Sequence, residues 1–343
     1  MKKIKHILLL FFVCCTLGGC EKALMGNDAD SDAVAVFEYL WERVDEQYAF
    51  FDVKHVDWQA VHDSLRPQVY EGMRQDKLFN IMAKMLNTLQ DGHVNLTSPF
   101  DVSRNDSVYY RMYANSNVDW NVVMTHYLKT DYHTTGSLLH NVLRDSTVIY
   151  VRYSSFSNVI HPSHFNYVVT KYPKAKGLIL DLRQNGGGNV DNIWLLLKLM
   201  PNHGQKLYTT HIKTGPGHED FGPLQTVYAH NDCGSYKAYT NPVVVLVDRG
   251  SFSATSTFAI CTQGFDNMIL MGDTTGGGLG LPNGGELPNR WRYRFSITRT
   301  YALDGKNYEN GVPPDKRVLL NKDSVALGYD NVIERACDWI ISN

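Results

Sequence analysis

The sequence lacks several features that would place it in a specialised class of proteins. It has no internal repeat and no low-complexity tract, and 43% hydrophobic with 20% charged residues exclude a disordered, collagenous or coiled-coil chain. Outside the N-terminus, no apolar run is long enough to span a bilayer. The 33 Lys and Arg residues are balanced by 35 Asp and Glu residues. This balance excludes a basic nucleic-acid surface, so we expect no nucleic-acid partner.

Cysteine is also scarce. The six cysteines are Cys14, Cys15, Cys20, Cys233, Cys261 and Cys337. The last three are widely spaced and odd in number, which excludes a disulfide framework and fits no zinc spacing. No HExxH motif occurs either. We therefore expect buried, small apolar cysteines and neither a metal nor an organic cofactor.

The N-terminus has its own pattern. Residues 1–19 combine three early lysines, a short apolar core and a small-residue cleavage site, as secretory signal peptides do. About 12 apolar residues are too few for the roughly 20 of a spanning helix. Because the site ends in Cys20, the segment resembles a bacterial lipoprotein signal, which implies lipidation of Cys20, a tether over residues 20–32 and attachment in the cell envelope.

The remaining chain divides into regions of different pattern. Residues 33–93 show three helical periodicities, the second capped by Asp57 and the third expected to stop at Gly92. Residues 94–146 hold short β-type runs, which predict a small connecting region. Residues 147–343 alternate buried-strand runs with helical patterns, which predicts an α/β core. The predicted core strands are 147–153, 177–182, 242–247 and 293–301; the predicted helices are 162–172, 189–200, 254–263 and 330–341.

A glycine cluster follows the second of these core strands. Residues 181–188 read DLRQNGGG and lead into a predicted helix. Consecutive glycines let the backbone approach a ligand closely and turn N–H groups toward it. A phosphate loop is one interpretation, but its Lys-Ser/Thr ending is missing. An oxyanion hole uses the same backbone geometry.

A serine-rich turn follows the third core strand. Residues 247–256 read VDRGSFSATS, so Ser253 lies between a strand and a helix. A nucleophile there would have helix N–H donors beside its oxygen. Serine is equally a preferred helix N-cap, and these residues alone favour the cap. Two further segments, DGH at 91–93 and YENGVPPD at 308–315, have similarly ordinary explanations when taken singly.

Taken together, these segments resemble one family. From about residue 33 to 320 the chain is similar to the C-terminal-processing, or tail-specific, serine peptidases, whose superfamily includes the tricorn core protease. The resemblance is carried by LQDGHVNL, VIYVRYSSF, DLRQNGGG, VVVLVDRGSFSATS, GDTTGGG and YENGVPPD. It implies a crotonase- or ClpP-like α/β core of mixed sheet and helices with a helical N-terminal subdomain. No PDZ module is recognisable in residues 94–146.

The resemblance also implies roles for individual residues. Ser253 would be the nucleophile, and the N–H of Ala254 with that of Gly187 or Gly188 would form the oxyanion hole. The processing proteases use a lysine base, but residues 274–280 contain none. The tricorn-like branch uses a histidine and a glutamate. The resemblance therefore assigns His93 as base and Glu309 as its direct or indirect orienting carboxylate, although Gly92 stands where tricorn has serine.

The function implied is a lipid-anchored serine endopeptidase acting on polypeptides. Its alternative is an inactive member of the same fold that binds peptides or apolar ligands, because retinoid-binding relatives share the scaffold. A different serine hydrolase is disfavoured, since Ser253 lacks the G-x-S-x-G context. The sequence leaves the oligomeric state open.

Overall fold

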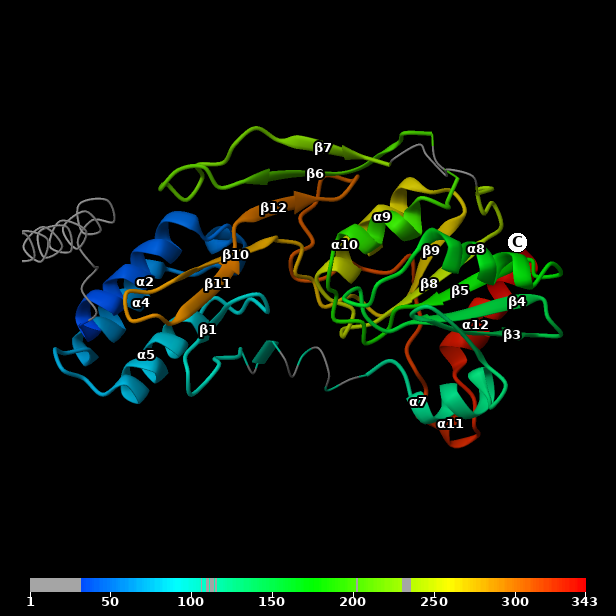
Figure 1. Ribbon diagram of the computed structural model, residues 1–343, viewed down its shortest axis with the longest axis horizontal. Helices are drawn as coiled ribbons and strands as arrows, with labels where there is room; N and C mark the ends of the chain where they lie inside the picture. Colours follow the sequence, from blue (N-terminus) through cyan, green and yellow to red (C-terminus); the bar gives the residue numbers. More distant parts are fainter. Residues whose placement is uncertain are drawn as a thin grey trace, which may run out of the picture.

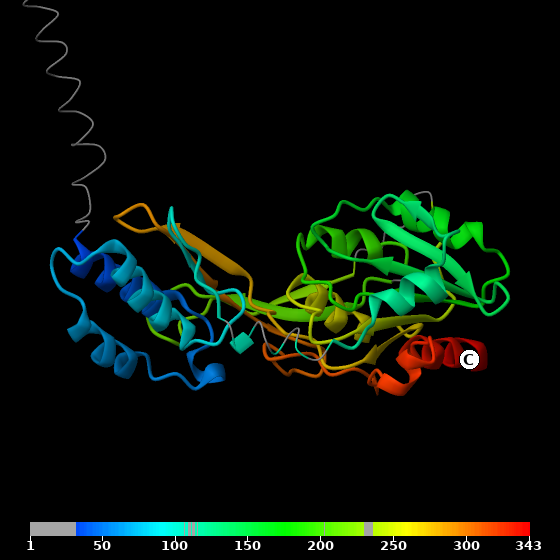
Figure 2. The same cartoon turned by 90° about the horizontal axis from the view of Figure 1, so that it is seen from below.

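The computed structural model describes residues 32–105, 107–108, 111, 114, 116–201, 203–229 and 236–343. The signal segment, Cys20 and Cys233 lie outside these residues. The described chain forms two lobes with a long β-ribbon running between them (Figure 1). Figure 2 shows the same lobes from below, with the last helix along one side of the larger lobe. Within the described ranges, no helix combines the length and apolar character that crossing a membrane requires.

The N-terminal lobe packs helices against a small sheet. Its helices are α2 (Ala33–Gln47), α3 (Phe51–Lys54), α4 (Trp58–Leu65), η1 (Arg66–Gln68) and α5 (Gln75–Asn87). Its antiparallel sheet has the order β1 (Asn95–Thr97), β11 (Arg292–Ser296) and β10 (Pro282–Glu286). Phe37, Leu40 and Met82 from the helices share one core with Trp291 and Phe295. A segment from the C-terminal third therefore completes this lobe.

The ends of two N-terminal helices test the sequence patterns. The Asp57 carboxylate accepts a hydrogen bond from the Ala60 N–H at 3.0 Å, which confirms the predicted cap of α4. The expected end of α5 at Gly92 is wrong, because the helix ends at Asn87. Tighter i to i+3 hydrogen bonds close its last turn. The residue with positive φ is then Gln90, at 46°.

The larger lobe is built on a seven-stranded mixed sheet. In spatial order its strands are β13 (Lys316–Arg317), β9 (Met268–Gly272), β8 (Val243–Val247), β5 (Gly177–Asp181), β4 (Val148–Tyr153), β3 (Leu138–Leu143) and β2 (His133–Thr135). The strands from β13 to β4 are parallel, and β3 and β2 continue antiparallel. The predicted mixed α/β class is confirmed.

Helices cover both faces of this sheet because its buried strands alternate their side chains between two cores. Leu178 and Leu180 face the core formed with α8 (Pro162–Lys171), α9 (Asp191–Leu197) and α10 (Ala254–Cys261). Ile179 faces the opposite core, formed with α7 (Trp120–Val122), the π-helical turn η2 (Val123–Leu128) and α12 (Asn331–Ser342). Two short elements, η3 (Thr262–Gly264) and α11 (Lys322–Ala326), complete the lobe.

Two regions depart from the predicted pattern. The single strand expected over 293–301 is wrong, because β11 ends at Ser296 and β12 (Thr298–Tyr301) joins a different sheet with β6 (Lys206–Ile212) and β7 (Gln225–Tyr228). This second sheet is the ribbon between the lobes (Figure 1). The connecting region expected over 94–146 is distributed: β1 lies in the N-terminal lobe, whereas α7, η2, β2 and β3 lie in the larger one.

The parallel strands bring together the loops that carry the glycine cluster, the serine turn and the GDTTGGG segment. The chain leaves β4, β5, β8 and β9 at the same edge of the sheet, because parallel strands end together. The glycine cluster follows β5, the serine turn follows β8, and the GDTTGGG loop follows β9. These loops meet the N-terminal lobe, where the segment after α5 carries His93.

Candidate active site

Ser253 lies in a strained turn at the start of α10. Its φ is 58° and its ψ is −119°, a combination that costs a non-glycine residue about 1–3 kcal/mol and is found mostly at functional sites. The hydroxyl makes no hydrogen bond to the helix N-terminus, so the helix-capping interpretation is wrong. Instead, Ser253 Oγ lies 2.9 Å from Nε2 of His93, a residue 160 positions earlier in the chain.

The backbone around Ser253 is held from two sides. The Ser253 N–H donates to the Gly277 carbonyl at 2.9 Å, and the Phe252 N–H donates to the Asn185 carbonyl at 3.0 Å. A Cβ on Gly277 would lie 1.9 Å from the carbonyl oxygen of Glu309, so only glycine permits this approach. The loops after β5 and β9 therefore clamp the serine turn between them.

The glycine cluster meets the serine turn through its main chain. A Cβ on Gly187 would lie 2.8 Å from the Ser253 Cβ and 2.9 Å from the Ala254 nitrogen. The Gly187 N–H itself donates to Asn185 Oδ1 at 3.0 Å, so it is already committed. Among the described residues we find no acceptor for the Gly188 N–H. Ala254 begins α10, and its N–H has no acceptor within the helix.

Most charged residues of the DLR and VDR segments are buried and have a structural role. Arg183 is fully buried, and its guanidinium donates to Asp181 Oδ2 at 2.5 Å and to Asp330 Oδ2 at 2.8 Å. Although burial opposes both shifts, these ion pairs lower the pKa of Asp181 and raise that of Arg183. Asp248 accepts hydrogen bonds from the Gln184 main chain and side chain at 2.8 and 2.6 Å. The DLR and VDR segments thus hold the loops in place.

His93 is fixed by its backbone and by ring packing. Its N–H donates to Asp91 Oδ1 at 2.7 Å, and its carbonyl accepts from Arg294 Nε at 3.1 Å. The Phe252 ring packs against the imidazole, with ring centroids 4.8 Å apart. Burial lowers the pKa of His93 to about 4, against the opposing charge of Asp91. The imidazole is therefore neutral at physiological pH and able to accept a proton.

The second ring nitrogen of His93 has no conventional partner. Nδ1 is buried and makes no hydrogen bond of ordinary geometry, although the Gly280 backbone is near enough to favour the protonated ring. Glu309 does not bind it: this carboxyl is buried and accepts from the Gly280 N–H at 2.9 Å. Burial, and then the charge of Asp91, raise the pKa of Glu309 to about 8.

The sequence interpretation missed Asp91 as a member of this cluster. Asp91 is 1% exposed and accepts from the Ser296 hydroxyl at 2.9 Å and the Tyr48 hydroxyl at 3.2 Å, besides the His93 backbone. The charge of Asp91 therefore acts on both neighbours: it raises the pKa of His93 and that of Glu309. The DGH text contained the signal, because a carboxylate two residues before a base can bind that residue's N–H.

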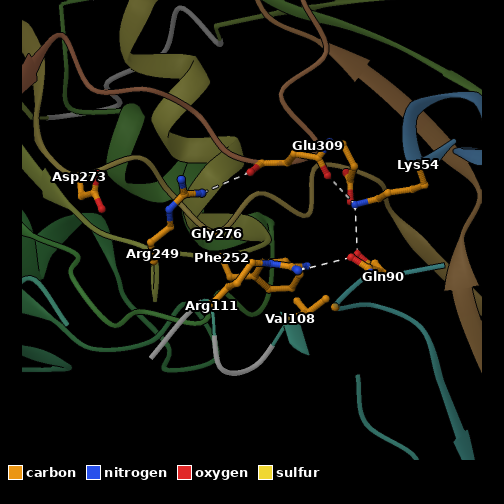
Figure 3. A pocket seen from close by; sticks show the side chains of 11 residues that line it. Lys54, Gln90, Val108, Arg111, Arg249, Phe252, Asp273, Gly276 and Glu309 are labelled. Atoms are coloured by element: carbon orange, nitrogen blue, oxygen red, sulfur yellow. Dashed lines mark hydrogen bonds between the residues drawn. The ribbon is translucent and has the colours of Figure 1, made fainter. Parts of the chain in front are cut away.

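A pocket opens beside the serine and histidine. Its volume is about 610 Å³, and Gly92, the neighbour of His93, contributes to its wall. Phe252, the neighbour of Ser253, also lines it (Figure 3). Lys54, Arg111 and Arg249 also line it. Sequence analysis singled out none of these cations. Across the described ranges, no group of three or more His, Cys, Asp or Glu side chains could hold a metal ion. Cys261 and Cys337 are free and buried.

Comparisons with known proteins agree with this architecture. The model of peptidase family S41 matches residues 147–318, and the model of the tricorn protease C1 domain matches residues 33–87. A crystal structure of a candidate peptidase from Parabacteroides merdae ATCC 43184 is 35% identical, with a TM-score of 0.84, over 91% of this chain and 97% of that one. The tricorn protease structure shares the fold at 14% identity and a TM-score of 0.55, over 90% of this chain and 36% of that one.

Two curated relatives match parts of the chain. The carboxy-terminal processing protease CtpA of Bacillus subtilis is 23% identical over 184 residues, which cover 53% of this chain and 37% of that protein. The tail-specific protease of Haemophilus influenzae is 31% identical over 104 residues, which cover 30% of this chain and 13% of that protein. The chain thus spans well under two thirds of either relative. From the family match over half of its length, the chain belongs to peptidase family S41, a family of serine peptidases.

Proposed function

We propose that the protein is a serine endopeptidase that cleaves polypeptides with Ser253 as nucleophile and His93 as general base. The observation that carries this proposal is the 2.9 Å distance between Ser253 Oγ and His93 Nε2. The Ser253 backbone is strained, its hydroxyl makes no hydrogen bond to the helix N-terminus, and the preceding residue, Phe252, lines a pocket large enough for substrate side chains. The non-catalytic alternative gives no reason for this strain.

The reaction follows from the atoms present. His93 Nε2 takes the proton of Ser253 Oγ as the oxygen attacks a peptide carbonyl, and the imidazolium then protonates the leaving amine. Water repeats the sequence on the acyl-enzyme, which releases the acid product. Nε2 must accept a hydrogen bond in the resting state, so the proton of the neutral ring resides on Nδ1.

Backbone amides would stabilise the tetrahedral intermediate. Of the donors that the sequence offered, Gly188 and Ala254 fit best, because the Gly187 N–H is committed to Asn185. Gly187 would instead keep the space beside the Ala254 nitrogen free of a side chain. Removing one oxyanion donor typically costs about 10²–10³ in turnover.

The charge of Asp91 would stabilise the imidazolium, and Glu309 would act indirectly. The Asp91 charge raises the pKa of His93 against the stronger effect of burial, so it favours the proton-bearing ring. Glu309 acts indirectly in this proposal, as a neutral carboxyl group at pH 7 that accepts the Gly280 N–H, because burial and the charge of Asp91 raise its pKa to about 8. The orienting role that the family resemblance gave to Glu309 would thus be shared with Asp91.

We also propose that the protein is lipid-anchored in the cell envelope through Cys20. The N-terminal sequence supports this attachment, and the fold carries no argument for or against it. In a bacterial host, the wild type should incorporate radiolabelled palmitate and partition into detergent, whereas Cys20→Ala should do neither. Equal palmitate incorporation in both proteins would contradict the anchor.

Substitution of the nucleophile tests the enzymatic proposal. Ser253→Ala should abolish casein cleavage while the circular dichroism spectrum and melting temperature stay close to wild type. Ser64→Ala, which removes a solvent-exposed hydroxyl in α4, is the matched control and should cleave normally. Only wild type and control should react with a fluorophosphonate probe. Undiminished cleavage by Ser253→Ala, or an unreactive wild type, would overturn the proposal.

A further inference from the structure

The pocket beside Ser253 has an unusual charge distribution. Three cationic side chains reach it from separate segments: Lys54 from α3, Arg249 from the turn after β8, and Arg111 from the chain between the lobes. Figure 3 shows Lys54 and Arg249 on opposite sides of the pocket, with Arg111 and Phe252 also among its lining residues. Because Phe252 directly precedes the proposed nucleophile, whatever fills this pocket lies next to the reacting bond.

The three cations are held by neutral acceptors. Lys54 Nζ donates to Asn310 Oδ1 at 2.7 Å and to the Gln90 carbonyl at 3.3 Å. Arg111 lies 3.4 Å from Gln90 Oε1, and Arg249 lies 3.4 Å from the Asn310 carbonyl. Within the part of the chain that the structure describes, none of them forms an ion pair with a carboxylate. Their charges are therefore left for a ligand.

The carboxyl groups of the pocket do little to neutralise this charge. Asp273 lines the pocket but forms its ion pair with Arg317, at 3.3 Å. Glu309 is buried and hydrogen-bonded to the Gly280 N–H, and burial raises its pKa to about 8. At neutral pH the pocket thus carries a net positive charge beside an uncharged imidazole.

We propose that this pocket binds a carboxylate group of the polypeptide substrate. The inference rests on the proposed function, because it makes the pocket a specificity subsite of the same peptidase. Lys54 and Arg111 offer several N–H donors to one anion, and charge-assisted hydrogen bonds are about twice as strong as neutral ones. The volume of about 610 Å³ accommodates more than a bare ion, so the carboxylate enters as part of a residue.

Two parts of a polypeptide supply this group: the C-terminal α-carboxylate and the side chain of Asp or Glu. Three pools of octapeptides with randomised uncharged residues distinguish them. One pool is the free acid, one is the C-terminal amide, and one is the amide with a single Glu at a random position. All carry an uncharged methoxycoumarin label, because a charged dye would itself compete for the cations.

The primary measurement is binding to the full-length Ser253→Ala variant by equilibrium dialysis. This readout does not depend on turnover. We expect the free-acid pool, the Glu pool or both to bind at least about tenfold more tightly than the plain amide, the value of one charge-assisted hydrogen bond. The preference should shrink at high salt, since Lys54 and Arg111 are partly solvated. Whichever acidic pool is favoured identifies the source of the carboxylate.

Variants test whether the pocket causes the preference. Lys54→Gln and Arg111→Gln, each made on the Ser253→Ala background, should each reduce the acid-over-amide ratio by about three- to tenfold. Arg249 is kept, because its guanidinium also binds the Thr275 carbonyl at 3.2 Å. Arg335→Gln, which removes an exposed positive charge from α12, is the matched control and should leave the ratio unchanged.

The outcomes separate this inference from the proposed function. Equal binding of acidic and amide pools, or binding of none at millimolar concentration, would overturn the carboxylate subsite. So would an acid preference that survives both pocket substitutions. Cleavage of the same pools by the protein with Ser253 intact is scored independently. Cleavage without acid preference would support the peptidase proposal and contradict the carboxylate subsite. Acid-selective binding without cleavage would support the subsite and contradict the peptidase proposal.

Discussion

The two lobes fix their contributions to the active site in different ways. In the larger lobe, Ser253 is clamped by main-chain hydrogen bonds to the loops after β5 and β9, over fully buried ion pairs. In the N-terminal lobe, His93 follows a helix end and is held by Asp91, Arg294 and ring packing. The geometry of the proposed nucleophile is thus set within one lobe, whereas its contact with the proposed base depends on how the lobes pack.

Arg299 on β12 joins the ribbon that runs between the lobes to the N-terminal lobe. Its guanidinium binds the Ala49 carbonyl and the Asp52 carboxylate of the N-terminal lobe, and also Glu219. Arg299 itself is 7% exposed. The comparison of the lobes therefore predicts separable effects: changes in the larger lobe should damage the nucleophile and oxyanion geometry, and changes at Arg299 should damage the placement of His93.

Among substitutions outside the Ser253–His93 pair, the largest effect is expected from Gly187→Ala. The new Cβ would lie 2.6 Å from the Phe252 carbonyl oxygen and 2.8 Å from the Ser253 Cβ, at a φ of 94°. We expect kcat for peptide cleavage to fall by about 10²–10³, as for loss of an oxyanion donor. Gly305→Ala is the control, because that glycine has a similar φ of 78° with nothing within 4 Å of the added atom. Comparable kcat losses in both variants would show that backbone strain alone, and not crowding at the serine, is responsible.

A smaller effect on kcat is expected from removing the contacts of Arg299 with the N-terminal lobe. Arg299→Ala should lower kcat by about tenfold, because a displacement of roughly 1 Å at a reacting group costs up to about 10²-fold. The rate of fluorophosphonate labelling should fall by the same factor, since peptide cleavage and labelling both need His93 beside Ser253. Exposed Arg74, which pairs only with its neighbour Asp76, gives the control Arg74→Ala. An Arg299→Ala protein with normal labelling would remove the link between lobe packing and catalysis.

The pH profile of peptide cleavage reports on His93, the proposed base. Because burial lowers the pKa of His93 to about 4, the imidazole loses its ability to accept a proton only in strong acid. We expect kcat/KM to decline as the pH falls through about 4, measured on an uncharged peptide over a range where the protein stays folded. A decline centred near 6.5, the ordinary value of histidine, would mean that the site is more solvated than the closed lobes imply.

The smallest effect on activity is expected from Glu309→Gln. Its carboxyl has a pKa raised to about 8, so the neutral amide resembles the state that predominates at pH 7, and kcat there should change by less than about tenfold. Stability should differ more. The folded protein keeps a proton that the unfolded chain releases near 4.5. Wild-type stability should therefore fall between pH 4.5 and 8 relative to the variant, by on the order of 1 kcal/mol per pH unit.

Denaturant unfolding of both proteins at several pH values measures this difference. A constant stability gap across that range would mean that Glu309 is ionised in the folded protein. It would then serve as a charged partner of His93, as the family resemblance first implied, and the division of roles between Asp91 and Glu309 would need to be reversed.

Much of the larger lobe could be predicted from the sequence because its strands are short, apolar and β-branched. Val243–Val247 is an example, buried on both faces. The end of α5 could not be predicted from Gly92, since the helix closes earlier through local hydrogen bonds. The end of β11 before Ile297 could not be predicted either, because the alternating pattern of β11 continues into β12. The two strands pair with different partners, β10 and β6, which the pattern does not indicate.

In the candidate active site, too, local sequence patterns predicted some features and not others. Ser253 and His93 came together in the sequence interpretation only through resemblance to a family, because no local pattern joins residues 160 positions apart. The cationic pocket could not be predicted in this way. Gln90, Arg249 and Asn310 each lie in a different motif of the family, but the resemblance gave them no role, and their proximity to one another and to Lys54 arises from the packing of the two lobes.

The most direct test of the account is the rate at which a fluorophosphonate labels Ser253 in the wild type and in His93→Ala. General-base assistance is worth about 10²–10⁴ in rate, so the variant should be labelled slower by that factor while its far-UV circular dichroism is unchanged. Mass spectrometry should place the label on Ser253. Equal rates in the two proteins, or a label on another serine, would contradict the claim that the imidazole of one lobe activates the hydroxyl of the other.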